Sequence, residues 1–451
     1  MQHRHFLTGR SAALVAAITA LLLGQISAQA AGLEAQLLIE ADSGKVLHAE
    51  NATYPWHPAS ITKLMTAYVT LKAVREGRIS FDTLLTVSAN ATAQSPSKMG
   101  FKPGTKLTVD NALKMMMVKS ANDMAVVLAE GVSGSIDGFA ADMNRAARRL
   151  GMTQTNYVNP NGLPDDAQVT SARDIAILAR SFMQEMPEYD MYLHLPAIKF
   201  GKRVTRNFNG LIGRYPGADG IKTGFICASG YNLVGSATRG GRRLIAVVLG
   251  ASSGAARTSE AAELLERGFS GPTVSWLTPS LGTVDALAAI EAAPVNLREE
   301  MCGKHRKRPA TETSDGEEAT VASTATPAEG MPEIPFTLSL TTTKPTTPIR
   351  GADLLSPPTT PTQVYEVYLG PARKQPTTQI ADVSAAQAPA KPGQIAPGTP
   401  TVRRASAGAV PWTTFSSSAL SITPPESVAT TDSDEPGVPL PRPRPRLAGK
   451  R

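Results

Sequence analysis

Proline divides this chain into two parts that differ in their capacity to fold. Of its 35 prolines, 12 precede residue 300 and 23 follow it, although the second part holds only a third of the 451 residues. That second part is mostly Thr, Pro, Ala and Ser, so it cannot bury enough apolar surface to offset the entropy lost on ordering. We therefore expect one folded domain over residues 31–275, a linker over residues 276–302 and a disordered tail over residues 303–451.

The first 30 residues have the three parts of a secretory signal peptide. Arg4 and Arg10 form a basic start, residues 12–23 are apolar, and Ala28-Gln29-Ala30 matches the small-residue cleavage pattern. The apolar run is short for a membrane-spanning helix, so we favour cleavage after Ala30 over an uncleaved anchor. Cleavage removes two positive charges, and the formal net charge of +7 becomes +5. We predict an exported protein on the periplasmic or extracytoplasmic side of the cell envelope.

The sequence contains two cysteines, Cys227 and Cys302. An oxidising compartment permits a disulfide between them, but Cys302 lies at the edge of the predicted tail. The sequence therefore favours two unpaired cysteines and leaves pairing as the open alternative. Two cysteines without neighbouring histidines do not suit a zinc site, so we expect no metal and no cofactor.

Apolar patterning predicts an α/β domain. Residues 37–40 and 46–50 surround a turn sequence and are expected to form a β-hairpin. Later in the domain, three short apolar runs predict an antiparallel meander at residues 221–226, 231–237 and 244–249. Helical periodicity occurs at residues 60–75, 109–117, 121–130, 136–150, 172–183 and 257–268, and one more short helix is expected at residues 284–292. Strands at both ends of the domain, with helices between them, imply an α/β layer fold in which the terminal strands share one sheet.

The stretch Pro58-Ala59-Ser60-Ile61-Thr62-Lys63 is the first candidate for chemistry, because it places a hydroxyl and an amine three residues apart at a helix start. Residues i and i+3 lie on one helix face, so Ser60 and Lys63 can meet. In a dry site the lysine ammonium loses solvation, its pKa falls, and the neutral amine can accept the serine proton. We expect this pair to act as nucleophile and base.

The spacing of this pair is weak evidence by itself, because Ser95 and Lys98 repeat it among prolines and glycines, where a helix is not expected. A Ser-x-Asn pattern also occurs twice, whereas Lys-Thr-Gly occurs once. The order of the motifs is more specific: Ser60-x-x-Lys63, then Ser120-Ala121-Asn122, then Lys222-Thr223-Gly224.

With its motifs in this order, the chain resembles the penicillin-recognising serine enzymes, and more narrowly the low-molecular-mass D-alanyl-D-alanine carboxypeptidases. The resemblance covers residues 33–270 and rests on four segments: Pro58-Ala59-Ser60-Ile61-Thr62-Lys63-Leu64-Met65-Thr66, Ser120-Ala121-Asn122-Asp123-Met124-Ala125, Asn159-Pro160-Asn161-Gly162-Leu163 and Gly220-Ile221-Lys222-Thr223-Gly224-Phe225. It implies a β-lactamase/transpeptidase-like fold, in which helices flank an antiparallel sheet and form a helical subdomain.

The resemblance also implies a reaction. Ser60 would attack the penultimate carbonyl of a peptidoglycan stem peptide ending in D-Ala-D-Ala, with Lys63 as base, and water would hydrolyse the resulting acyl-enzyme. Ser120 and Asn122 would relay protons and hold the substrate amide. The backbone N–H groups of Ser60 and Phe225 would form the oxyanion hole. β-Lactams are expected as covalent inhibitors, and nucleic acid is not expected as a partner.

Substrate recognition is expected on the Lys-Thr-Gly strand. Lys222 and Thr223 can face a carboxylate there, and Gly224 lets another backbone approach, so a peptide could dock as an added strand. The resemblance assigns the terminal carboxylate to Thr223 and Arg257, and implies that Lys222 helps to lower the pKa of Lys63. For Arg257, a surface charge at the start of a helix is the alternative interpretation.

Several other functions could use some of these residues. A Ser-His-Asp hydrolase is disfavoured because His57, three residues before Ser60, precedes the expected helix. A class A β-lactamase needs a Glu for rapid deacylation, whereas residues 151–170 contain Asp165 and Asp166 but no Glu. A DD-endopeptidase would form the same acyl-enzyme. A wall-binding scaffold with a vestigial site is disfavoured because every predicted catalytic group is present.

The end of the tail is basic and rich in proline, since residues 439–447 read PLPRPRPRL. Such a segment is stiff and extended. We favour a solvated spacer, with peripheral contact to membrane lipid or wall polymers as the alternative.

Overall fold

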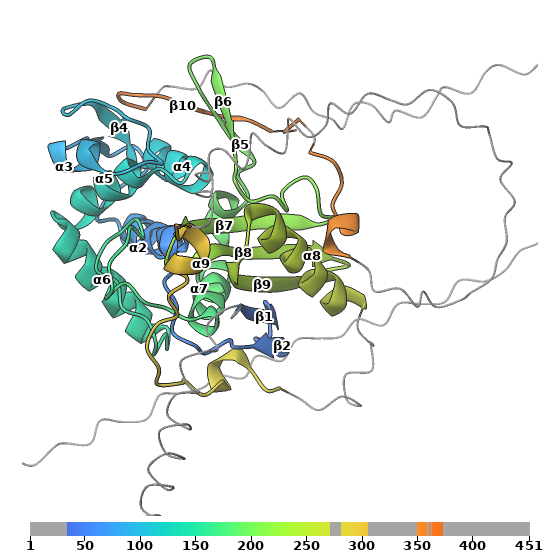
Figure 1. The fold of residues 1–451 in the computed structure, drawn as a ribbon. Helices are drawn as coiled ribbons and strands as arrows, with labels where there is room; N and C mark the ends of the chain where they lie inside the picture. The colour runs from blue at the N-terminus through green and yellow to red at the C-terminus, as the bar shows by residue number, and fades with distance from the viewer. Residues whose placement is uncertain (1–33, 271–280, 305–349, 359, 362, 373–451) are drawn as a thin grey trace, which may run out of the picture. The chain divides into compact units, whose positions relative to one another are not determined.

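The computed structural model describes residues 34–270, 281–304, 350–358, 360–361 and 363–372 (Figure 1). Its centre is a five-stranded antiparallel sheet in the order β2-β1-β9-β8-β7. The strands are β1 (Ala35–Glu40), β2 (Val46–Glu50), β7 (Ala218–Ile226), β8 (Gly230–Arg239) and β9 (Arg242–Ala251). The predicted hairpin and meander are therefore confirmed. Pairing of β1 with β9 confirms that both ends of the domain share one sheet.

Strand β9 shows why helices cover both faces of this sheet. Its even-numbered residues 244–248 belong to one apolar core and its odd-numbered residues 245–249 to another. This alternation follows from the two-residue period of a β-strand. Helix α8 (Gly254–Ser270) packs on the first core, and α7 (Ala172–Glu185) packs against β9 and β1 from the second (Figure 1).

The second face also carries the helical subdomain. Its helices besides α7 are α2 (Thr62–Arg75), α3 (Ala89–Ala93), α4 (Val109–Lys119), α5 (Asn122–Ser133) and α6 (Ile136–Arg149). Helix α5 contacts α2, α3, α4 and α6, and its first eight residues are all buried. The start of α5, where Asn122 lies, is therefore placed in the interior. At α7 the predicted cap is present, because the Ser171 hydroxyl accepts a hydrogen bond from the Asp174 N–H.

Several short elements were not predicted from the sequence. They are the antiparallel pair β3 (Leu84–Thr86) and β4 (Lys106–Thr108), the 3₁₀ helix η2 (Pro187–Leu193), and the hairpin of β5 (Ala197–Phe200) and β6 (Arg203–Arg206). Each has three to seven residues, which is too short for a period to stand out from its surroundings.

Two predicted helices need correction. Ser60 does not lie in an α-helix: it lies in the 3₁₀ turn η1 (Ala59–Ile61), and α2 begins at Thr62. The apolar pattern does not distinguish the two, because 3₁₀ turns are common at helix starts. Of the helix expected at residues 284–292, only the 3₁₀ turn η4 (Val284–Ala286) is present, and a short helix α9 (Arg298–Cys302) follows it.

The preference for unpaired cysteines was wrong, because Cys227 and Cys302 form a disulfide with Cα atoms 5.7 Å apart. The segment before Cys302 is held on the domain by backbone hydrogen bonds. The Val295 N–H donates to the Pro55 carbonyl at 3.0 Å and the Leu297 N–H donates to the Ala228 carbonyl at 2.9 Å. Cys302 therefore belongs to the folded domain and not to the start of the tail.

Part of the predicted disordered tail also has defined structure. The described residues between 350 and 372 contain the 3₁₀ turn η5 (Gly351–Leu354), which packs on α8, and the strand β10 (Tyr365–Val367), which pairs in parallel with β5. The backbone N–H of Tyr368 donates to the Asn111 side chain at 3.0 Å. Because strand addition uses backbone groups, a polar composition does not reveal it. The rest of the tail and the predicted signal peptide lie outside the described residues.

Among the described residues no single helix is long and apolar enough to cross a bilayer. The bent pair of α5 and α6 has the length and apolar composition for it only when the two helices are taken together.

Candidate active site

Ser60 lies in a tight turn at the entrance to α2. Its neighbours Ala59 and Ile61 are fully buried, whereas Ser60 itself is partly exposed. Ala59 has a φ of 50°, a region that residues with a side chain seldom occupy. The turn therefore presents the Ser60 hydroxyl at an accessible position on a backbone that the surrounding segments must hold in place.

Lys63 is completely buried next to this hydroxyl. Its Nζ lies 2.9 Å from Ser60 Oγ, 2.7 Å from Asn122 Oδ1 and 2.6 Å from the backbone oxygen of Asn161. The two carbonyl-type oxygens can only accept hydrogen bonds. A neutral amine would give them its two N–H groups and direct its lone pair at the Ser60 hydroxyl. This arrangement can accept the serine proton.

The second motif lies between α4 and α5. Ser120 ends α4 with a φ of 57°, and its Oγ lies 3.0 Å from Lys222 Nζ. The Asn122 Nδ2 donates to the Ser95 carbonyl at 2.8 Å while its Oδ1 accepts from Lys63. Ser120, Asn122 and Lys222 are each at most 3% exposed, so the structure brings the three motifs into one buried polar group.

Strand β7 carries the third motif along the edge of the sheet. Thr223 is 1% exposed, and its Oγ1 is a buried atom with no hydrogen-bond partner among the described residues. Buried hydroxyls are normally satisfied, so this oxygen is a candidate ligand contact. Arg257, 3% exposed on α8, donates through Nη1 to the Gly224 and Asn232 carbonyls at 3.4 and 3.3 Å.

Gly224 is where β7 meets the nucleophile turn. A Cβ added at this position would lie 2.7 Å from the Ser60 nitrogen and 3.0 Å from the Ile61 nitrogen. Only glycine permits this approach of two backbones. Phe225 follows, and its ring lies on that of Tyr231 with centroids 4.3 Å apart.

The loop that contains Asn161 is one of the segments that carry the resemblance, but its contacts were not predicted. Its Asn161 oxygen contacts Lys63, and a Cβ on Gly162 would overlap the Ala59 carbonyl oxygen. Gln168 holds the loop from inside, since its Oε1 accepts from the N–H groups of Val158 and Asn159 at 2.7 and 3.1 Å. Asparagine, proline and glycine in succession indicated a loop, but a backbone oxygen gives no sequence signal.

The repeated Ser-x-x-Lys segment lies outside any helix, and its backbone contributes to the site. The Ser95 and Ser97 carbonyls accept from the side chain and backbone nitrogen of Asn122. The Lys98 ammonium donates to the Thr92 carbonyl at 2.9 Å. His57 is buried, with Nδ1 3.1 Å from the Gln168 carbonyl.

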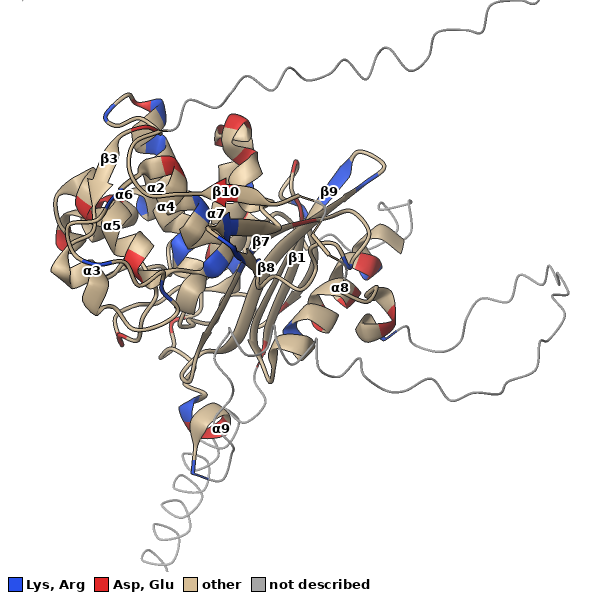
Figure 2. Ribbon diagram, turned by 90° about the horizontal axis from the view of Figure 1, so that it is seen from above, with Lys and Arg blue, Asp and Glu red and all other residues tan. Residues whose placement is uncertain are grey.

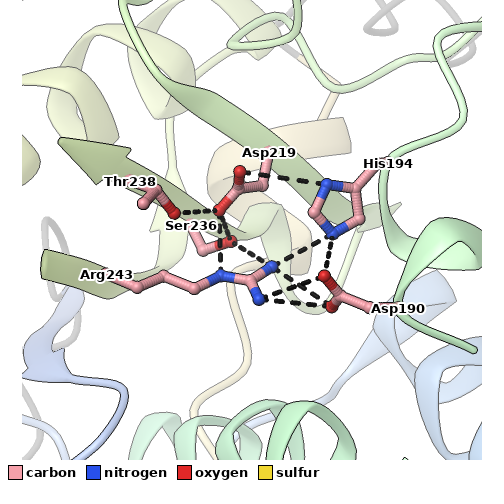
Figure 3. Close-up of polar contacts among 6 residues, drawn as sticks. All are labelled: Asp190, His194, Asp219, Ser236, Thr238 and Arg243. Carbon is pink, nitrogen blue, oxygen red and sulfur yellow. Dashed lines mark hydrogen bonds and ion pairs between the residues drawn. The ribbon is translucent and has the colours of Figure 1, made fainter. Parts of the chain in front are cut away.

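A charged cluster stabilises the start of β7, three residues before Lys222. It consists of Asp190, His194, Asp219, Ser236, Thr238 and Arg243 (Figure 3). Burial alone would raise the pKa of Asp190, but hydrogen bonding to His194 and the charges of His194 and Arg243 outweigh it, so the pKa is lowered. Asp219 joins β7 to β8 and β9 because Ser236, Thr238 and Arg243 all donate to its carboxylate.

The charge around the site is positive. Lys and Arg residues gather beside β7, between the sheet and the helices (Figure 2). Three of the buried basic residues, Lys63, Lys222 and Arg257, are predicted site residues. Among the described residues no cluster of three or more His, Cys, Asp or Glu could hold a metal ion. The arrangement suits an anionic ligand next to an activated hydroxyl.

The sequence model of the D-alanyl-D-alanine carboxypeptidases matches residues 23–253, which is just over half of the chain. The chain belongs to this family. DacF from Bacillus subtilis is 37% identical over 240 residues, which cover 52% of this chain and 61% of DacF. DacC from Escherichia coli is 36% identical over 251 residues, which cover 54% and 63%. The chain thus spans about three fifths of the length of these relatives.

Solved structures of the family establish the fold. DacD from Francisella tularensis is 32% identical with a TM-score of 0.51, over 52% of this chain and 70% of that one. Penicillin binding protein 5 from Haemophilus influenzae is 35% identical with a TM-score of 0.50, over the same shares. Together with the antiparallel sheet and its flanking helices, these matches confirm the predicted penicillin-recognising fold.

Proposed function

We propose that this chain is a serine-type D-Ala-D-Ala carboxypeptidase that removes the terminal D-alanine from peptidoglycan stem pentapeptides. The observation that carries the proposal is the contact of Lys63 Nζ with Ser60 Oγ, Asn122 Oδ1 and the Asn161 oxygen. A lysine held between two acceptors and one hydroxyl has the geometry of a general base for that hydroxyl. Family membership supports the same reaction.

In the first half-reaction, the Lys63 amine takes the Ser60 proton as Ser60 Oγ forms a bond to the penultimate carbonyl carbon. The resulting oxyanion is stabilised by the N–H groups of Ser60 and Phe225. Collapse of the tetrahedral intermediate breaks the peptide bond. The leaving amine takes a proton from the Lys63 ammonium directly or through Ser120, and D-alanine departs.

Substrate recognition relies on the edge position of β7. Among the described residues no strand pairs with the outer side of β7, so a peptide can add there through backbone hydrogen bonds. Thr223 Oγ1, Lys222 and Arg257 provide a hydroxyl and two cations for the terminal carboxylate of the peptide. Substrates with a free C-terminal carboxylate would therefore be favoured.

In the second half-reaction, water attacks the ester carbonyl, with Lys63 as base and Ser120 beside it. The exposed positions of Asp165 and Asp166 favour a carboxypeptidase over a β-lactamase, because neither carboxylate lies in a buried position suited to activating that water. β-Lactams would acylate Ser60 and leave slowly. The enzyme would work on the extracytoplasmic side of the envelope, where stem peptides are exposed.

Product analysis tests the proposal. Purified full-length protein is incubated with stem pentapeptide and, separately, with cross-linked wall fragments, and released D-alanine is measured alongside the Ser60→Ala variant. We expect release from the pentapeptide by the wild type only. Release from cross-linked fragments alone would favour an endopeptidase. Fast steady-state hydrolysis of penicillin would favour a β-lactamase. D-alanine release by the Ser60→Ala variant would refute the assignment.

A further inference from the structure

Asn232 is a buried amide that has no part in the reaction described so far. It lies on β8 directly opposite Gly224 of β7 and is 0% exposed. A buried side-chain amide is costly unless its polar atoms are hydrogen-bonded, so its partners indicate what it does. Asn232 has three: it donates through Nδ2 to the His57 carbonyl at 3.0 Å and the Pro58 carbonyl at 3.3 Å, and accepts through Oδ1 from the Gly250 N–H at 3.1 Å.

The Gly250 contact fixes Asn232 itself. Tyr231 pairs with Ala251 and Leu233 pairs with Val248, so β9 has one extra residue opposite Asn232, which forms a β-bulge. A bulge leaves a backbone group of the sheet ladder unpaired. Because the Asn232 Oδ1 accepts the Gly250 N–H, the side chain is anchored to the sheet and its Nδ2 is aimed away from β9.

The Nδ2 contacts reach the backbone just before the nucleophile. The His57 and Pro58 carbonyls lie three and two residues before Ser60, and Ala59 between them and Ser60 has the unfavourable φ of 50°. The Pro58 carbonyl also accepts the Ile61 N–H at 3.3 Å, which closes the turn. A strained backbone persists only when its surroundings hold it, and Asn232 is one of the groups that hold this turn.

We propose that Asn232 is a positioning residue that sets the separation between the two N–H groups of the oxyanion hole. One of them, Ser60 N–H, belongs to the turn that Asn232 holds. The other, Phe225 N–H, follows Gly224, the cross-strand neighbour of Asn232. Asn232 therefore links the two backbone segments whose N–H groups must face the same oxyanion. The inference rests on the proposed acyl-enzyme reaction.

Two variants separate positioning from stability. Asn232→Ala removes the three side-chain hydrogen bonds, whereas Asn232→Asp keeps the shape and the acceptor for Gly250 but loses the amide donors to the two carbonyls. In both we expect kcat for D-alanine release to fall by about 10- to 100-fold with KM changed less than about threefold, because the defect concerns the transition state. A peptide boronic acid places an oxygen of its Ser60 adduct in the same hole, so its affinity should fall in proportion to kcat/KM.

Asn111→Ala is the matched control. Asn111 is another fully buried asparagine, bonded to Thr108 and Tyr368 near the start of α4, so its loss should lower the melting temperature without changing kcat. If folded Asn232→Ala and Asn232→Asp keep kcat within about twofold of wild type, or if Asn111→Ala loses as much, the inference is wrong. A wild type that releases no D-alanine would instead refute the proposed function, and the rate of acylation by labelled penicillin would still test Asn232.

Discussion

Replacing Gly224 by alanine tests whether β7 and the nucleophile turn must meet backbone to backbone. The added Cβ would lie 2.7 Å from the Ser60 nitrogen, whereas ordinary contacts of a Cβ begin at 3.4 Å, so the two segments must separate by about 0.7 Å. Neither atom belongs to a flexible side chain that could turn aside. A displacement of this size at a reacting group costs about 100-fold in kcat/KM, or ~2.7 kcal/mol of transition-state stabilisation.

The measurement is kcat/KM for D-alanine release, together with the rate of acylation by labelled penicillin. Gly268→Ala is the control, because its Cβ would also be crowded, at 2.6 Å from Leu244 and 2.8 Å from Leu38, but against methyl groups in the core under α8. The control should lose stability and keep its activity. A folded Gly224→Ala variant that retains more than about a third of the wild-type kcat/KM would refute the reasoning.

Three further predictions concern stability. Replacing Cys227 and Cys302 by serine opens a loop with a sequence separation of 75 residues, so the free energy of unfolding measured in urea should fall by about 4 kcal/mol. A fall of less than about 1 kcal/mol would contradict this prediction. Asp190 has a lowered pKa in the folded state, so its ionised carboxylate stabilises the fold fully above pH 3.8, its ordinary pKa, and this stabilisation is lost as the pH falls through the lowered pKa. Between pH 5 and 2 the free energy of unfolding should therefore fall more for the wild type than for Asp190→Asn. Parallel falls in the two proteins would contradict the lowered pKa. Burial, and after it the charge of Glu34, raise the pKa of Glu260 to about 7, so ionisation of Glu260 destabilises the fold as the pH rises from 4.5 towards 7. The Glu260→Gln substitution should therefore raise the melting temperature more at pH 8 than at pH 5. An equal gain at both pH values would count against the raised pKa.

The sequence was informative where side chains carry the signal. Ordered motifs predicted Ser60, Lys63, Ser120, Asn122 and Lys222 as site residues. In the structure Lys63 Nζ contacts Ser60 Oγ and Asn122 Oδ1, and Lys222 Nζ contacts Ser120 Oγ. Apolar periodicity likewise predicted the sheet and the main helices, because burial of one face imposes a period.

Backbone contacts explain what the sequence did not reveal. The disulfide depends on Val295 and Leu297 hydrogen-bonding to distant carbonyls, and β10 is held by ladder bonds to β5. The Asn161 oxygen beside Lys63 is also a backbone atom. Every residue type offers the same N–H and C=O groups apart from proline, so no residue pattern predicts which of them will pair across long separations.

The geometry of the nucleophile turn results from three segments that are far apart in the sequence. Gly162 meets the Ala59 carbonyl, Gly224 meets the Ser60 nitrogen, and Asn232 holds the two carbonyls that precede Ala59. A non-glycine residue at positive φ, such as Ala59, costs about 1 to 3 kcal/mol. Helix α2 does not include Ala59, because the helix begins only at Thr62. These contacts converge on residues 57–60, so they help to hold the strained turn that carries the Ser60 N–H. It follows that substitutions at the three contacts should alter catalysis more than substitutions on the exposed end of α2.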